Sequence, residues 1–172
     1  MNEQASTVRS VALPAGAAIA NLYQGSNLAD AYATGLPAHA VGDAESLARY
    51  MFSLPSPGVS ALMGLRDTLV SAFGLKTARQ LKTGGSKRIG IFKIYASSAD
   101  EVVMGEDDKH LDFRISVLCA PGPDGVRKIT VATVVHCHNR LGRAYIALIA
   151  PFHKMIVRGT LRRAARAGWQ VA

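Results

Sequence analysis

The feature that most limits the fold of this chain is the alternation of apolar with mostly polar or small residues between Lys87 and His138. Four segments have this strand period, and short runs of Ser, Gly, Pro and charged residues separate them: 87–96, 101–105, 110–119 and 127–138. Strands joined by such short connections must be antiparallel, because a parallel crossover needs a dozen or more residues. The sequence therefore predicts a sheet built from consecutive hairpins.

A long helix is predicted directly after these strands. Asn139 is a suitable N-cap, and residues of helical period continue to about Ala167. The apolar positions on one predicted face are Leu141, Tyr145, Leu148, Phe152, Met155 or Ile156, and Gly159. Pro151 lies inside the pattern, and we expect it to kink the helix. At about 1.5 Å per residue the helix approaches 40 Å, enough to cross a whole sheet.

The first part of the chain predicts one strand and two shorter helices. Small residues alternate with larger ones over 29–36, which indicates a strand. Asp43 can cap a helix over 44–53, and Ser56 followed by Pro57 begins a second helix that Gly74 ends.

The predicted order is strand, helix, helix, four strands and long helix. No βαβ alternation occurs, which argues against a Rossmann or barrel fold. We predict an α+β helix-grip fold, in which a curved antiparallel sheet wraps around the long C-terminal helix and two small helices after the first strand close one end. Residues 1–27 are expected to be a lead-in segment, and residues 28–168 a single domain.

Four segments carry a resemblance to a known family: Ala29-Asp30-Ala31-Tyr32, Asp107–Arg114, Asn139–Tyr145 and Pro151-Phe152-His153-Lys154. Over nearly its whole length the chain resembles a bacterial family of unknown function related to the START and polyketide cyclase-like (SRPBCC) helix-grip superfamily. The resemblance implies a ligand cavity and a link to longer proteins with an oxidoreductase-like domain. It implies no catalytic residues, and this chain has no Gly-rich dinucleotide fingerprint, so no NAD site is expected.

Composition limits the class of protein and its location. The chain has 172 residues, of which 49% are hydrophobic and 19% charged, as in globular proteins. Residues 10–29 are uncharged, but Pro14 and Gly16 argue against a signal peptide, and charges interrupt every stretch long enough to span a membrane. Cys119 and Cys137 have no disulfide or finger spacing and are predicted to be reduced thiols. We therefore expect a cytoplasmic protein.

The net charge of +8 lies near the C-terminus, because nine of the 20 basic residues and none of the 12 acidic residues follow Asp124. Arginines near the end of a helix favour its dipole and are normally solvated. Nucleic acid is not expected as a partner, because only Trp169 is an aromatic residue among these basic ones. Peripheral contact with a membrane surface remains an alternative role for the arginines, which are Arg158, Arg162, Arg163 and Arg166.

Histidine and aspartate gather on one face of two neighbouring predicted strands. A turn centred near Asp124 places Asp112 opposite His136, and His110 opposite His138. These side chains are suitable ligands for zinc or iron, and Asp112, His136 and Arg114 are candidates for general acid–base catalysis. Residues of these types on the polar face of an antiparallel sheet are usually solvated or paired, with Arg114 available to Asp112. We therefore predict no metal centre and no cofactor.

The opposite, apolar face of the same strands is expected to meet the long helix and to form a ligand cavity, with Thr133, Tyr95 and Tyr145 as polar anchors. The predicted ligand-binding residues are Tyr95, Phe113, Ile115, Thr133, Val135, Tyr145, Ile149 and Phe152. The expected ligand is a small lipophilic or aromatic molecule. Two alternatives remain: a cyclase-like, hydrolase-like or metal-dependent enzyme, and an interaction module for an oxidoreductase or a membrane surface. The sequence does not determine the oligomeric state.

Overall fold

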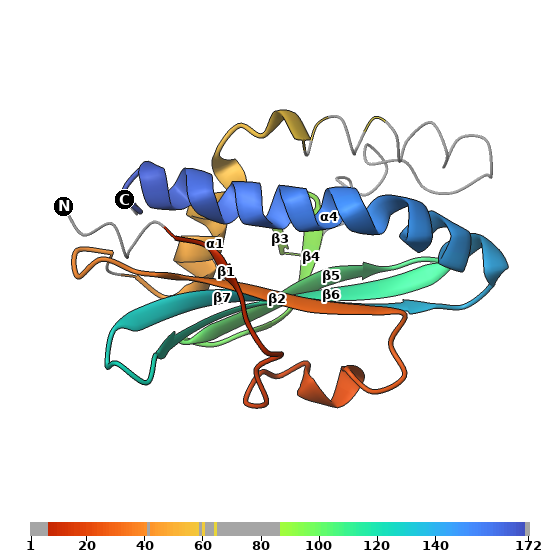
Figure 1. Ribbon diagram of the computed structural model, residues 1–172, viewed down its shortest axis with the longest axis horizontal. Coiled ribbons are helices and arrows are strands. Elements are labelled where there is room, and N and C mark those ends of the chain that lie inside the picture. Colours follow the sequence, from red (N-terminus) through yellow and green to blue (C-terminus); the bar gives the residue numbers. More distant parts are fainter. Residues whose placement is uncertain (1–6, 41, 59, 61–63, 65–86, 171–172) are drawn as a thin grey trace.

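The hairpins expected after Lys87 form the centre of a seven-stranded antiparallel sheet in a computed structural model of the chain (Figure 1). The structure describes residues 7–40, 42–58, 60, 64 and 87–170. The sheet order is β1-β2-β7-β6-β5-β4-β3. The strands are β1 (Arg9–Ser10), β2 (Leu28–Gly35), β3 (Arg88–Ile89), β4 (Phe92–Ser97), β5 (Glu101–Asp107), β6 (Leu111–Pro121) and β7 (Arg127–Cys137). The α+β class and the antiparallel pairing are confirmed.

The hairpin of β6 and β7 has the predicted register. Asp112 pairs with His136, and the ladder continues without a shift to Pro121 opposite Arg127. The turn closes through hydrogen bonds from the Gly122 N–H to the Val126 carbonyl and from the Gly125 N–H to the Gly122 carbonyl, 2.8 and 2.9 Å long. Gly125 adopts a φ of 73°, a left-handed conformation that glycine enters at little cost.

Two predictions about the strands were wrong. Segment 87–96 is not one strand, because Gly90 turns the chain with a φ of 59° and separates β3 from β4. The residues before β2 also contribute a strand, since β1 pairs with β2 through Arg9 opposite Ala33 and Ser10 opposite Tyr32. No alternation signals a strand of two residues, which is why the sequence pattern missed it.

The helix boundaries follow their predicted caps. The helix α1 (Ala44–Ser53) begins where the Asp43 carboxylate accepts a 2.7 Å hydrogen bond from the Ser46 N–H. The long helix α4 (Arg140–Arg166) begins where the Asn139 side chain accepts a hydrogen bond from the Gly142 N–H, and it continues through Pro151. Figure 1 shows its first turns inclined to the rest of the helix. The predicted second small helix lies mostly outside the described residues.

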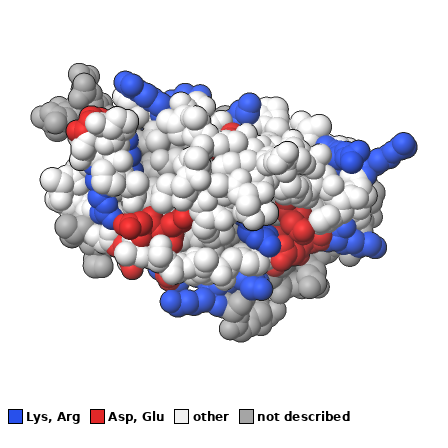
Figure 2. Space-filling model, turned by 90° about the horizontal axis from the view of Figure 1, so that it is seen from below, with Lys and Arg blue, Asp and Glu red and all other residues white. Residues whose placement is uncertain are grey.

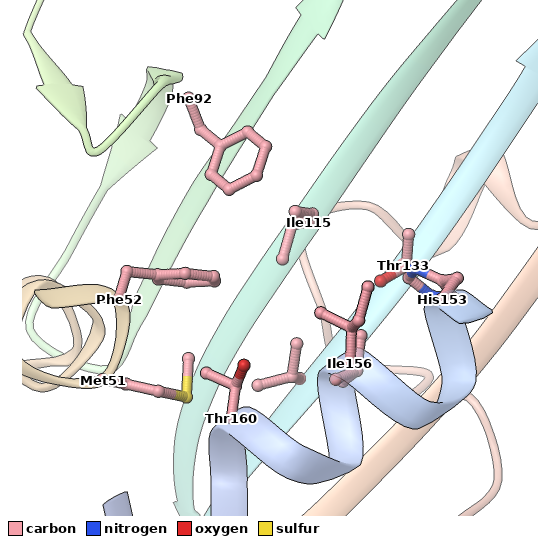
Figure 3. Close-up of a pocket in the computed structure, with 10 residues that line it drawn as sticks. Met51, Phe52, Phe92, Ile115, Thr133, His153, Ile156 and Thr160 are labelled. Carbon is pink, nitrogen blue, oxygen red and sulfur yellow. The ribbon is translucent and has the colours of Figure 1, made fainter. Parts of the chain in front are cut away.

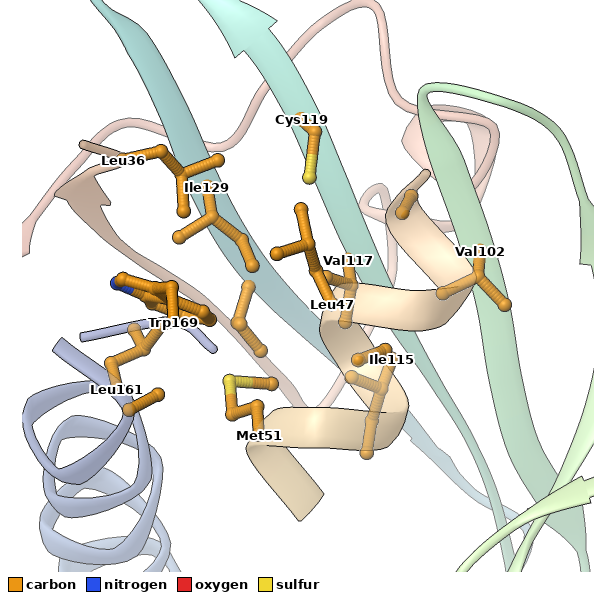
Figure 4. Packing of buried hydrophobic residues seen from close by; sticks show 14 of the residues in the cluster. Leu36, Leu47, Met51, Val102, Ile115, Val117, Cys119, Ile129, Leu161 and Trp169 are labelled. Carbon is orange, nitrogen blue, oxygen red and sulfur yellow. The ribbon is translucent and has the colours of Figure 1, made fainter. Parts of the chain in front are cut away.

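The larger core lies between one face of the sheet and the helices α1 and α4. Alternate residues of β6 and β7 point into it, and they meet Leu47 and Met51 of α1 and Leu161 of α4 (Figure 4). Trp169, which is 1% exposed, packs into the same cluster. The residues from β6 and β7 are Ile115, Val117, Cys119, Ile129 and Val131.

A second, smaller core covers the other face of the sheet. Residues before β2, including Ala17 and Ile19 beside the 3-10 helix η2 (Ala20–Leu22), pack on Val103 and Val134 of the sheet. Figure 2 views the molecule from this side, where acidic groups lie beside Lys and Arg on a mostly uncharged surface. The sequence predicts solvated or paired side chains on this face; Asp112 and His138 form such a pair, whereas the N-terminal segment buries another part of the face. Among the described residues, no helix has the length and apolar character needed to cross a membrane.

Two glycines of α4 predict opposite effects of one substitution on stability. A Cβ atom at Gly142 would collide with the His110 carbonyl, whereas at Gly159 its nearest neighbour would be Arg163 Nη1, the far end of a flexible side chain, at 3.2 Å. We expect Gly142→Ala to lower the free energy of unfolding by about 1–3 kcal/mol through overpacking. Gly159→Ala should raise it by about 0.5–1 kcal/mol, because alanine loses less backbone entropy in a helix. Urea unfolding measures both effects, and two changes of the same sign would contradict this packing.

Candidate functional site

An apolar cavity of about 110 Å³ lies between the sheet and α4 (Figure 3). Its walls come from α1, the strands β4, β6 and β7, and one face of α4. The lining residues are Met51, Phe52, Phe92, Ile115, Val131, Thr133, His153, Ile156, Val157 and Thr160.

Strand alternation and helical spacing explain why residues from these elements line the same cavity. Ile115 and Thr133 are ladder partners in β6 and β7, so their side chains share a face of the sheet. His153, Ile156, Val157 and Thr160 are spaced by three, four and seven residues, which places them on one side of α4. The cavity is therefore a gap between two regular surfaces.

Thr133, one of the residues predicted to bind a ligand, is a polar residue in the wall of the cavity. The residue is 3% exposed, and its buried Oγ1 atom has no hydrogen-bond partner within the described ranges. Leaving a buried hydroxyl unpaired costs about 1–3 kcal/mol, so native proteins seldom leave one without a reason. A bound molecule with a polar atom would supply the missing partner.

His153 and Asp30 form a second polar feature, which sequence analysis missed. His153 Nε2 lies 3.1 Å from Asp30 Oδ1, and the two side chains are only 19% and 13% exposed. The Tyr32 hydroxyl makes a long hydrogen bond of 3.5 Å to the other Asp30 oxygen. Asp30 is also the β2 ladder partner of Thr133. Register and helix packing thus bring a carboxylate, an imidazole and a hydroxyl to the same end of the cavity.

Burial affects the pKa of the tyrosine beside this pair. The pKa of Tyr32 is raised, first because the ring is buried and second because the Asp30 carboxylate repels a phenolate, although Arg158 acts in the other direction. Tyr32 therefore stays a neutral hydrogen-bond donor to Asp30 at neutral pH.

Of the eight residues predicted to bind a ligand, Ile115 and Thr133 line the cavity. Phe113 packs edge-on against the lining residue Phe92, with ring centroids 5.7 Å apart. Val135 and Ile149 are buried outside the lining, and Tyr145 is partly buried there.

The remaining two predicted ligand-binding residues point elsewhere. Phe152 is 47% exposed, because the side of α4 that faces the sheet is the one that carries His153 and Ile156. Tyr95 lies on the opposite face of the sheet, since its neighbour Ile94 takes the inward position in β4. Neither residue contributes to the walls of the cavity.

Tyr95 belongs instead to a charged cluster. Its hydroxyl donates a 2.7 Å hydrogen bond to Asp107, and the Arg114 guanidinium lies 3.7 Å from the centroid of its ring. Burial and the bond to Asp107 raise the pKa of Tyr95 to about 12. Arg114 forms an ion pair with Asp107 at 2.6 Å, so the expected pairing of Arg114 with Asp112 was wrong.

The histidine cluster has the predicted backbone register but not convergent side chains. His138 Nε2 lies 2.9 Å from Asp112 Oδ2, in a half-exposed pair. His136 Nε2 lies 2.8 Å from the Leu22 carbonyl, and His110 Nδ1 lies 2.7 Å from the Asn139 side-chain nitrogen. Within the described ranges, no group of three or more His, Cys, Asp or Glu residues is arranged to hold a metal ion. His136 thus holds the N-terminal segment to the sheet, His110 contacts the N-cap of α4, and His138 pairs within the β6–β7 hairpin.

The fold and the cavity define an α+β domain in which a long C-terminal helix covers one face of an antiparallel sheet above an apolar pocket. A family model described as protein of unknown function (DUF2867) matches residues 22–160, and the chain belongs to that family. No curated protein and no solved structure matches the chain.

Substitution of His136 should destabilise the fold more than substitution of the more exposed His138. We expect His136→Ala to lower the free energy of unfolding by about 1 kcal/mol, because the bond to the Leu22 carbonyl is lost. Amide hydrogen exchange should also accelerate in η2, which that bond holds to the sheet. The matched control is His138→Ala, whose exposed pair with Asp112 is expected to contribute less and to leave η2 unchanged. Equal effects of the two substitutions on η2 would contradict this role.

Proposed function

We propose that this domain binds a small lipophilic or aromatic molecule in the cavity between the sheet and α4. The observation that carries the proposal is the buried Thr133 hydroxyl, which has no hydrogen-bond partner among the described residues, in a mostly apolar wall. Binding sites for small molecules commonly have this composition, with mostly apolar walls and a few polar groups that orient the ligand.

The size of the cavity limits the ligand. Its volume of about 110 Å³ is somewhat below that of an engineered apolar cavity of about 150 Å³ that takes up benzene. A molecule of one ring, or the end of a longer chain, fits this space. Phe52 and Phe92 supply aromatic contacts at one side, and Thr133 and His153 supply polar contacts at the other.

The relationship to the START and polyketide cyclase-like superfamily is part of the same proposal. The antiparallel sheet, the long C-terminal helix and the cavity between them support a helix-grip fold. Bacterial origin, a cytoplasmic location, a domain spanning 28–168 and an oxidoreductase partner stay predictions of the sequence. The free thiols of Cys119 and Cys137 agree with a reducing compartment.

Toluene provides a direct test of the cavity. We expect toluene to bind the wild-type protein and to shift the NMR signals of the methyl groups of Ile115, Val131 and Val157, which line the cavity. Val157→Phe should weaken toluene binding by about tenfold or more, because the added ring occupies the space. The matched control is Val126→Phe at a position that is 48% exposed in the β6–β7 turn, where toluene affinity should not change.

Two outcomes would overturn the proposal. One is that neither toluene nor phenol produces saturable shifts in the wild-type protein. The other is that Val157→Phe remains folded, as judged by its amide spectrum, and still binds toluene with wild-type affinity.

Phenol tests the polar part of the site. Its hydroxyl can pair with Thr133 Oγ1, whereas the methyl group of toluene cannot. We expect Thr133→Val, which replaces the hydroxyl by a methyl group, to weaken phenol binding by about tenfold and to leave toluene binding unchanged or stronger. An equal effect on both ligands would show that Thr133 does not orient the ligand.

A further inference from the structure

We propose that the cavity catalyses proton transfer within a small carbonyl compound, with His153 as the general base and Thr133 as the donor to the carbonyl oxygen. This inference rests on the proposed function, because the substrate must first occupy the cavity. It adds a reaction, a substrate class and a role for each polar group of the site.

The geometry of His153 makes it a suitable base. An ionised carboxylate only accepts hydrogen bonds, so the bond to Asp30 assigns the ring proton to Nε2. The other nitrogen, Nδ1, then carries a lone pair, and it makes no hydrogen bond within the described part of the chain. His153 is one of the lining residues, so its ring borders the space that a bound molecule would fill.

Asp30 is the positioning residue for this base. Its Oδ1 atom fixes the tautomer and the orientation of the His153 ring, as a carboxylate does in a catalytic triad. When Nδ1 takes up a proton, the imidazolium ion keeps its Nε2 hydrogen bond to the Asp30 carboxylate, 3.1 Å away. The long hydrogen bond from Tyr32 helps to hold the other carboxylate oxygen.

Thr133 complements the base with a donor. Its hydroxyl has no hydrogen-bond partner among the residues that the structure describes, so it can donate to an oxygen that gains negative charge. The same observation excludes Thr133 as a nucleophile activated by His153 in this arrangement, because that role requires a hydrogen bond between them. A base beside a donor, without an activated nucleophile, favours proton transfer over acyl transfer.

The reaction is balanced without a co-reactant. Nδ1 removes a proton from the carbon next to the carbonyl group, and the electron pair of that C–H bond forms an enolate whose oxygen accepts the Thr133 hydrogen bond. The imidazolium then returns a proton to another carbon of the conjugated system. The product is an isomer of the substrate with a shifted double bond, and the protein returns to its starting state.

The substrate class follows from the walls of the cavity. None of the described lining residues is Lys or Arg, so an uncharged compound is favoured over an anion. The volume of about 110 Å³ fits a single six-membered ring. A β,γ-unsaturated cyclic ketone has both this size and the acidic C–H bond that the reaction needs.

The test uses 3-cyclohexen-1-one, whose conversion to 2-cyclohexen-1-one is followed by the ultraviolet absorbance of the conjugated product. We expect the wild-type protein to accelerate the conversion above buffer. His153→Gln and Thr133→Val should each lower kcat/KM by about 100-fold. The matched control is His138→Gln, which changes a histidine paired with Asp112 outside the cavity and should leave kcat/KM unchanged.

Asp30→Asn tests positioning with a readout beyond rate. We expect kcat/KM to fall at least about tenfold. The ¹⁵N spectrum of His153 should change from the tautomer protonated at Nε2 to a mixture of both tautomers, because the asparagine amide does not select one. Asp112→Asn is the control, and it should leave the His153 spectrum unchanged.

The outcomes separate the two proposals. Toluene binding in the wild-type protein and in His153→Gln, without isomerisation of the ketone or exchange of its α-protons in D₂O by the wild type, would overturn the catalytic inference alone. Undiminished isomerisation in His153→Gln would also overturn it. A complete lack of toluene and phenol binding would overturn the proposed function and this inference together.

Discussion

The pairing of β6 with β7 is the interaction on which the rest of the structure depends. Each strand has 11 residues, and the turn at Gly122–Val126 fixes which residues face each other. A shift of one residue would move every side chain of a strand to the opposite face. Ile115 and Val131 would then leave the core beneath α4, and Thr133 would leave the cavity. The register therefore determines the core and the site together.

This register could be predicted because it depends on local information, namely strand period and loop length. The hydrogen-bond partners of the histidine side chains could not be predicted. His136 bonds to Leu22, which is 114 residues away in the sequence and belongs to a segment without a periodic pattern. That segment covers part of the sheet face on which polar side chains were expected to be solvated or paired. The packing of an irregular segment on a sheet depends on contacts between residues distant in the sequence. No local sequence pattern indicates such contacts.

In the candidate site, too, local sequence patterns predict some residues, whereas others depend on contacts between distant parts of the chain. Thr133 and Ile115 could be predicted because strand alternation places them opposite the helix. The Asp30–His153 pair joins residues 123 positions apart, and it depends on the rotation of α4 about its axis. That rotation is ambiguous in the sequence, because apolar residues lie on two adjacent sides of the helix. Leu148 and Met155, which belong to the predicted inward stripe, are 52% and 61% exposed.

The two outermost strands of the sheet, β1 and β3, each contain only two residues. An exposed strand edge presents unpaired N–H and C=O groups to which another chain can add a strand, and long flat edges promote aggregation. Edges this short offer few such groups for intermolecular pairing. Each of these two strands also carries an arginine, Arg9 in β1 and Arg88 in β3, so both ends of the strand order are poor templates for the addition of another chain.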